Sequence, residues 1–232
     1  MLDRIAADAS DRAPARTVIV FLGDLIDRGP RSADVVERLR TYRPAFARPL
    51  FLMGNHEEVL LRILGGEGDL IPDWLRFGGA ECAESYGVDP DELERSPAAA
   101  AVKLLQDAIP PGHRRFLSGF ADSASFGDYL FVHAGIRPGV ALANQVPRDL
   151  RWIRLPFLDD VADHGHCVVH GHTISEEVEF RSNRIGLDTG AYRTGVLSAL
   201  GIEEGASWLL QTEAEVPKAE ELASVANFSA AY

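Results

Sequence analysis

Four short motifs rich in Gly, Asp, Asn and His each follow an apolar, strand-like run, and this arrangement restricts the fold more than any other feature of the chain. The motifs are GDLIDRG (23–29), GNHE (54–57), VHAG (132–135) and HGHT (170–173). The runs before the first two, Thr17–Leu22 and Pro49–Met53, are typical of buried parallel strands. Because ligands bind beyond the carboxyl ends of the strands in open α/β sheets, we expect all four motifs to meet at one site.

The first half of the chain alternates strand-like and helical patterns. Helices are expected over about 32–40, beginning at a Ser that suits a helix start, and over 56–64, ending at a Gly pair. From there to about residue 128 the pattern changes to helical pieces broken by Gly and Pro. The clearest of these pieces are 98–108 and 113–120. We interpret residues 65–128 as a helical insertion.

The second half is rich in strand-like segments separated by short turns. These segments are 129–132, 167–169, 184–187, 195–202 and 207–211. Together with the first half they predict an α/β fold in one domain over residues 1–211. Residues 212–232 are polar and rich in Ala, show little periodicity, and are expected to form a loose C-terminal tail.

Composition limits what the protein binds and where it works. The formal charge of -12 opposes the clustered Lys and Arg of nucleic-acid binders, so we expect no nucleic-acid partner. No apolar run is long enough to span a bilayer, and the N-terminal residues do not resemble a signal peptide. We therefore expect no membrane partner and a cytoplasmic location. Cys82 and Cys167 lie far apart, which argues against a disulfide framework and against a cysteine zinc site.

The polar side chains in the motifs are of the kinds that bind metal ions. Carboxylate, amide and imidazole groups together suit Mn, Fe or Zn better than the all-oxygen shell of Ca or Mg. Each motif alone has a simpler explanation, because a GD pair is often a turn and a buried histidine often bonds only to the backbone. Their joint occurrence after four strand-like runs favours a metal site.

In this order the motifs resemble the phosphoprotein phosphatase branch of the calcineurin-like metallophosphoesterases, over about residues 1–211. The resemblance implies a sandwich of mixed β-sheets flanked by helices, and two divalent metal ions, with Mn favoured and Fe or Zn as alternatives. It makes Asp24 the carboxylate that bridges both metals, and it assigns Asn55, His133 and His172 to the second metal. His170 has no ligand counterpart in this branch and is expected to be supporting or structural.

The resemblance also assigns the catalytic residues. It implies in-line attack by metal-bound hydroxide on a phosphate monoester, with His56 as the general acid and Asp27 orienting its imidazole. Arg28 and Arg154, the second in the segment RWIR, are expected to bind phosphate oxygens. The implied substrate is phosphoserine or phosphothreonine in a protein, or a small phosphoester. Asp188, in a turn after the last ligand, is expected to be structural.

Two other functions stay open on the sequence. A symmetric dinucleoside tetraphosphatase shares the metal chemistry, but its motif usually reads GNHD and lacks the DRG aspartate. Glu57 and Asp27 therefore favour the protein phosphatase branch. A degenerate, non-catalytic protein that binds phosphate or metal is the second alternative, because the first motif of the family, D-x-H-G, is missing from the chain as given.

The chain opens inside an amphipathic helix over residues 1–9, where the family first has a strand that ends in D-x-H-G. We therefore expect about twenty further residues before Met1, enough for that strand and its turn. Without them the first strand is absent, and the first metal keeps only Asp24 among its assigned ligands.

Overall fold

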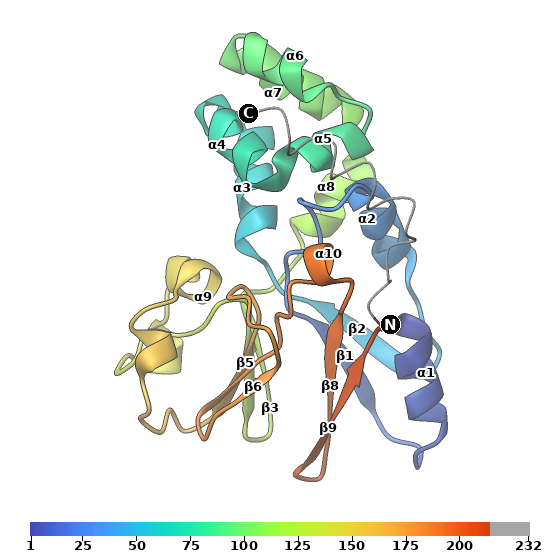
Figure 1. The fold of residues 1–232 in the computed structure, drawn as a ribbon, viewed down its shortest axis with the longest axis vertical. Coiled ribbons are helices and arrows are strands. Elements are labelled where there is room, and N and C mark those ends of the chain that lie inside the picture. The colour runs from blue at the N-terminus through green and yellow to red at the C-terminus, as the bar shows by residue number, and fades with distance from the viewer. Residues whose placement is uncertain (214–232) are drawn as a thin grey trace, which may run out of the picture.

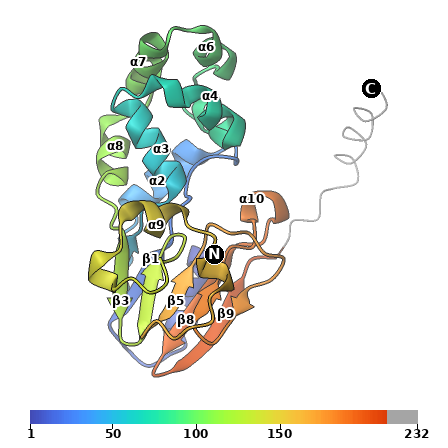
Figure 2. The same cartoon turned by 90° about the vertical axis from the view of Figure 1, so that its left-hand side faces the viewer.

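The computed structural model describes residues 1–213, which form a β-rich body with a helical part above it (Figure 1 and Figure 2). The expected α/β fold with mixed sheets and flanking helices is confirmed. Most of the expected C-terminal tail lies outside the described residues. Within residues 1–213, no helix has both the length and the apolar character that a membrane span requires.

The first sheet carries the first two motifs at the ends of its strands. β1 (Thr17–Phe21) and β2 (Ala47–Phe51) pair in parallel, and α2 (Ser32–Thr41) connects them. α3 (Asn55–Leu64) begins at the GNHE motif, soon after β2 ends. The parallel strands expected from the two apolar runs are therefore confirmed, with ends that differ by one or two residues, as is usual for strand boundaries.

The second sheet carries the other two motifs. Its strands, in spatial order, are β3 (Ser123–Phe126), β4 (Tyr129–Val132), β5 (Cys167–His170), β7 (Arg184–Gly186) and β6 (Glu179–Phe180). β4, β5 and β7 run parallel, whereas the two edge strands run antiparallel to their neighbours. The VHAG and HGHT motifs follow β4 and β5, so both leave the sheet at the same edge.

A β-hairpin and two helices complete the β-rich body. The hairpin consists of β8 (Ser198–Glu203) and β9 (Ala206–Gln211), and the helices are α1 (Leu2–Ser10) and α9 (Pro147–Trp152). The strand expected over 195–202 starts later, at Ser198. The reason is a short helix, α10 (Ala191–Thr194), which ends at Gly195 in a left-handed conformation with a φ of 71°.

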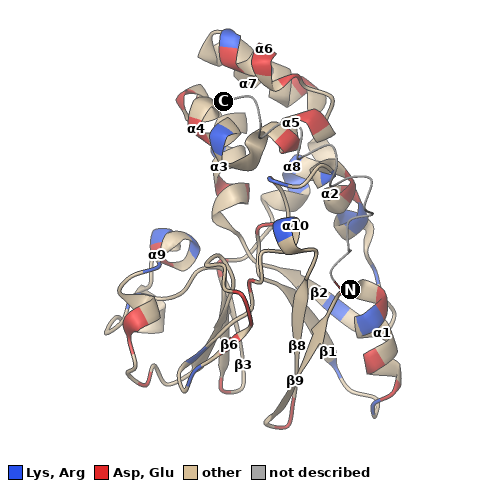
Figure 3. Cartoon of the chain, viewed as in Figure 1, with Lys and Arg blue, Asp and Glu red and all other residues tan. Residues whose placement is uncertain are grey.

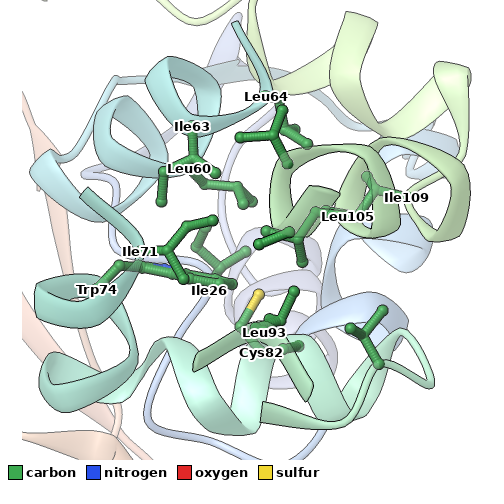
Figure 4. Packing of buried hydrophobic residues seen from close by; sticks show 14 of the residues in the cluster. Ile26, Leu60, Ile63, Leu64, Ile71, Trp74, Cys82, Leu93, Leu105 and Ile109 are labelled. Atoms are coloured by element: carbon green, nitrogen blue, oxygen red, sulfur yellow. The ribbon is translucent and has the colours of Figure 1, made fainter. Parts of the chain in front are cut away.

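The helical part packs around an apolar core. Besides α3 it contains α4 (Ile71–Trp74), α5 (Ala80–Ser85), α6 (Pro90–Arg95), α7 (Ala98–Ala108) and α8 (Pro111–Leu117). Figure 4 shows Leu60 and Ile63 among the side chains of this core, together with Leu105. On the outside of these helices Lys and Arg are interspersed with Asp and Glu (Figure 3).

The expected helical insertion is shorter than 65–128. The helix over 98–108 is confirmed, but the one expected over 113–120 spans Pro111–Leu117, and no further helix precedes β3 in the described chain. Residues 123–126 are a strand because they form a tight hairpin with β4, turning at Gly127 with a φ of 55°.

Candidate active site

The ends of β1, β2, β4 and β5 bring four polar side chains into contact. Nε2 of His133 lies 3.3 Å from Oδ1 of Asp24, 3.0 Å from Oδ1 of Asn55 and 3.3 Å from Nδ1 of His172. Nδ1 of His172 lies 2.9 Å from Oδ1 of Asn55. We call these four residues the ligand cluster, because they are the ones that the sequence assigned as metal ligands.

A divalent metal ion would fit the ligand cluster. Oδ1 of Asp24 is buried and has no hydrogen-bond partner. Such an unsatisfied buried atom costs about 1–3 kcal/mol, so its presence needs a compensating ligand. Asp24, His133 and His172 also offer ligand atoms that all lie within 4.8 Å of one another. Carboxylate, amide and imidazole donors are together the set that Mn, Fe and Zn accept.

Both histidines of the ligand cluster are in a state suited to metal binding. Nδ1 of His133 lies 2.6 Å from the carbonyl oxygen of Leu22, so it donates its proton there and leaves Nε2 free as a ligand atom. Burial, together with the nearby His133 and Arg154, lowers the pKa of His172 to about 3. Its imidazole is therefore neutral, which is the form that coordinates metals.

Unusual backbone conformations coincide with the site. Of the five non-glycine residues with positive φ among residues 1–213, four are Asp24 (52°), Asp27 (73°), Arg28 (61°) and His172 (64°). Residues with side chains rarely adopt this conformation, and those that do collect at functional sites. All four had been singled out from the sequence, so the backbone independently supports a functional role for these loops.

Asp27 and His56 form a buried pair beside the ligand cluster. Nδ1 of His56 lies 2.6 Å from Oδ2 of Asp27, and the indole N–H of Trp74 donates to the same carboxylate at 3.1 Å. Burial alone would lower the pKa of His56, but the hydrogen bond to Asp27 and the charge of Asp24 outweigh it and raise the pKa. This geometry holds a protonated imidazole in one orientation, as a proton donor requires.

Glu57 connects the first two motifs, a role that the sequence reasoning missed. Its fully buried carboxylate accepts backbone N–H groups of Asp24 at 3.0 Å, Leu25 at 2.6 Å and Gly54 at 3.0 Å. The loops of the first two motifs approach each other so closely that a Cβ on Gly23 would lie 2.7 Å from the backbone nitrogen of Gly54. A glutamate at the third position of a helix often bonds back to the start of that helix, and this pattern could have identified Glu57.

We expect Glu57→Gln to weaken Mn²⁺ binding about 10–100-fold, as for other residues that hold ligands in place. It should also lower the free energy of unfolding by about 1–3 kcal/mol, because one amide oxygen replaces two carboxylate oxygens. Calorimetric titration and chemical denaturation measure the two effects. Glu84→Gln, the same change at an exposed position of α5, is the control. If Glu57→Gln binds Mn²⁺ as tightly as the wild type, the hydrogen bonds from the two loops to Glu57 do not support the metal site.

The two expected phosphate-binding arginines differ in their surroundings. Arg28 lines a cavity of about 1150 Å³ that also contains His56 and three members of the ligand cluster. Arg154 is exposed and lies close enough to His172 to help lower its pKa. The other arginine of RWIR, Arg151, is occupied by an ion pair with Asp122. Arg154 is thus the arginine of that segment whose guanidinium can face a ligand.

Three other polar residues lie outside the ligand cluster. His170 is buried outside the ligand cluster, with Nδ1 3.1 Å from the carbonyl oxygen of Gly171. Asp188 accepts the backbone N–H of Gly190 at 2.9 Å and so stabilises the turn before α10. His113 contacts Glu37 at 3.0 Å in the helical part, away from the site.

Comparison with known proteins places this geometry in a family. A family model described as calcineurin-like phosphoesterase matches residues 1–196. The asymmetrical bis(5'-nucleosyl)-tetraphosphatase PrpE of Bacillus velezensis is 24% identical over 213 residues, covering 82% of this chain and 77% of that protein. A symmetrical bis(5'-nucleosyl)-tetraphosphatase of Methylococcus capsulatus is 29% identical over 125 residues, covering 54% of this chain and 35% of that protein.

A solved structure shares the fold. It is a crystal structure assigned provisionally as a diadenosine tetraphosphatase, with a TM-score of 0.60 and 19% identity, covering 91% of this chain and 87% of that one. The family model spans most of the chain, including the strand ends that carry all four motifs. The chain therefore belongs to the calcineurin-like phosphoesterase family, whose members use divalent metal ions.

Proposed function

We propose that this chain is a metal-dependent hydrolase of bis(5'-nucleosyl) tetraphosphates. The observation that carries the proposal is the convergence of the ligand cluster beside the buried pair of Asp27 and His56. The similar proteins of B. velezensis and M. capsulatus support the choice of substrate, because both are bis(5'-nucleosyl)-tetraphosphatases. The cavity beside the ligand cluster leaves room for a nucleotide, whose phosphates would be bound through the metal ion despite the acidity of the chain.

Each group of the site has a proposed task. The ligand cluster would hold a divalent ion, with Mn favoured, and such an ion activates water and neutralises charge on phosphoryl oxygens. Arg28 and Arg154 would bind phosphate oxygens through their guanidinium groups. His56 would give a proton to the departing oxygen. Asp27 holds its imidazole, and the indole N–H of Trp74 bonds to the same Asp27 carboxylate.

A phosphate monoester is a second candidate substrate, and one contact favours it. The 2.6 Å pairing of His56 with Asp27 provides a proton donor, which matters most when the leaving group is a poor one such as a serine or threonine alkoxide. A nucleoside phosphate leaves more readily. The phosphoprotein substrate implied by the motifs is therefore kept as the second proposal, behind the substrate that the named relatives favour.

A comparison of three substrates tests the proposal. We expect the Mn²⁺-loaded chain to hydrolyse diadenosine tetraphosphate with a higher kcat/KM than a phosphothreonine peptide or an aryl phosphate. A higher kcat/KM for the peptide would replace the first proposal by the second. No hydrolysis of any of the three, in protein that binds the metal, would contradict both and favour the non-catalytic alternative.

A further inference from the structure

Tyr192 presents an exposed aromatic ring beside Arg28. It lies in α10, which begins after Gly190, a glycine with a φ of 66°. The residue is 50% exposed, and the guanidinium carbon of Arg28 lies 5.0 Å from the centroid of its ring. Tyr192 also lines the cavity that contains Asp24 and His56. A large aromatic side chain therefore stands, half in solvent, at the wall of the candidate active site.

A second exposed aromatic residue contacts the same arginine through its backbone only. The backbone N–H of Arg28 donates to the carbonyl oxygen of Gly78 at 2.8 Å, and its Nε donates to that of Phe77 at 3.4 Å. Phe77, in the kinked segment Leu75–Gly79, is 63% exposed. Neither Phe77 nor Tyr192 belongs to the apolar cores formed by residues 1–213. Packing in a core therefore does not account for these two rings.

We infer that Tyr192 stacks on a nucleobase of the substrate while Arg28 holds one of its phosphates. The inference rests on the proposed function, because only a nucleotide substrate carries a base and phosphates together. Every base has a face that can stack on an aromatic ring, so this contact recognises nucleotides as a class rather than one base.

A ring that only held Arg28 in place would behave differently. The contact between the guanidinium and Tyr192 would then help every phosphate ligand equally, whether or not the ligand has a base. A ring that stacks on the base strengthens the binding of nucleotides selectively. A nucleotide and its phosphate-only counterpart therefore separate the two roles.

The test is calorimetric binding of adenosine 5'-diphosphate and of inorganic pyrophosphate to the Mn²⁺-loaded chain. In Tyr192→Ala the Kd of the nucleotide should rise about 5- to 150-fold, which is the range expected for loss of one stacked base. The Kd of pyrophosphate should rise far less. Tyr192→Phe keeps the ring and should keep the wild-type ratio of the two Kd values. Phe180→Ala removes a similarly exposed ring, 54% in solvent, from β6 outside the cavity and should change neither Kd.

The outcomes separate this inference from the proposed function. An equal rise of both Kd values in Tyr192→Ala, or a loss of the ratio in Tyr192→Phe, would overturn the inference and leave the proposed function standing. The reverse outcome is also distinguishable. If Tyr192→Ala selectively loses nucleotide binding but the wild-type protein does not hydrolyse diadenosine tetraphosphate, the stacking role is supported and the proposed function is overturned.

Discussion

Replacement of His56 by Asn should lower turnover of an alkyl phosphate monoester by about 10²–10⁴-fold, the range for removal of a general acid. His56 is bonded through Nδ1 to Asp27 at 2.6 Å, which leaves its other ring nitrogen to deliver a proton. An asparagine amide keeps the polarity of the site but cannot supply that proton. The loss should shrink for an aryl phosphate, whose leaving group needs little protonation. Steady-state kinetics on a series of esters measures this dependence.

Metal affinity separates this role from a structural one. His56→Asn should bind Mn²⁺ nearly as tightly as the wild type in calorimetric titration, since His56 is not part of the ligand cluster. His166→Asn is the matched control, because His166 is a half-buried loop histidine that precedes β5. Its turnover should equal that of the wild type. Near-normal turnover of His56→Asn on the ester with the poorest leaving group would show that His56 is not the proton donor.

Asp24→Asn should weaken Mn²⁺ binding by more than about 100-fold and should remove measurable hydrolysis. The loss of affinity should exceed the range for residues that only hydrogen-bond to a metal ligand. The substitution keeps the shape of the side chain but removes the negative charge that a ligand between two cations provides. Oδ1 of Asp24 is buried with no protein hydrogen-bond partner, so it is free to bind a metal. Calorimetric titration with Mn²⁺ measures the affinity and the number of binding events.

The same titration tests whether Asp24 bridges two ions. Asn55→Ala and His133→Ala should each affect mainly one binding event, whereas Asp24→Asn should affect all of them. Asp107→Asn, the same change on the exposed face of α7, should bind as the wild type does. Two undisturbed binding events in Asp24→Asn would exclude the bridging role.

The sequence was sufficient to predict the parts of the site that depend on strand ends. Polar motifs that follow apolar runs leave a sheet at its carboxyl edge, which predicts that Asp24 and Asn55 lie together at one sheet and His133 and His172 at the other. That the two pairs meet was an expectation from the shared chemistry of the motifs, and the contacts of His133 agree with it. The helix Ala98–Ala108 was also predictable, because its apolar residues repeat with helical spacing.

Contacts between residues far apart in the chain could not be predicted in this way. Trp74 bonds to Asp27 from the helical part, and Tyr192 reaches Arg28 from the C-terminal part. Both contacts depend on how separate layers pack, which local patterns do not specify. Glu57 likewise binds the backbone of Asp24 and Leu25, which lie on another loop that meets it only in the folded protein.

Restoring a divalent ion to chelator-treated protein tests the central claim most directly. Hydrolysis of diadenosine tetraphosphate should be lost when the protein is stripped of metal. It should return on addition of Mn²⁺, in proportion to the occupancy measured by calorimetry, and should not return in His172→Ala. Full hydrolysis by protein whose metal content is verified as negligible by mass spectrometry would contradict the claim that the ligand cluster is the metal centre of a phosphoesterase.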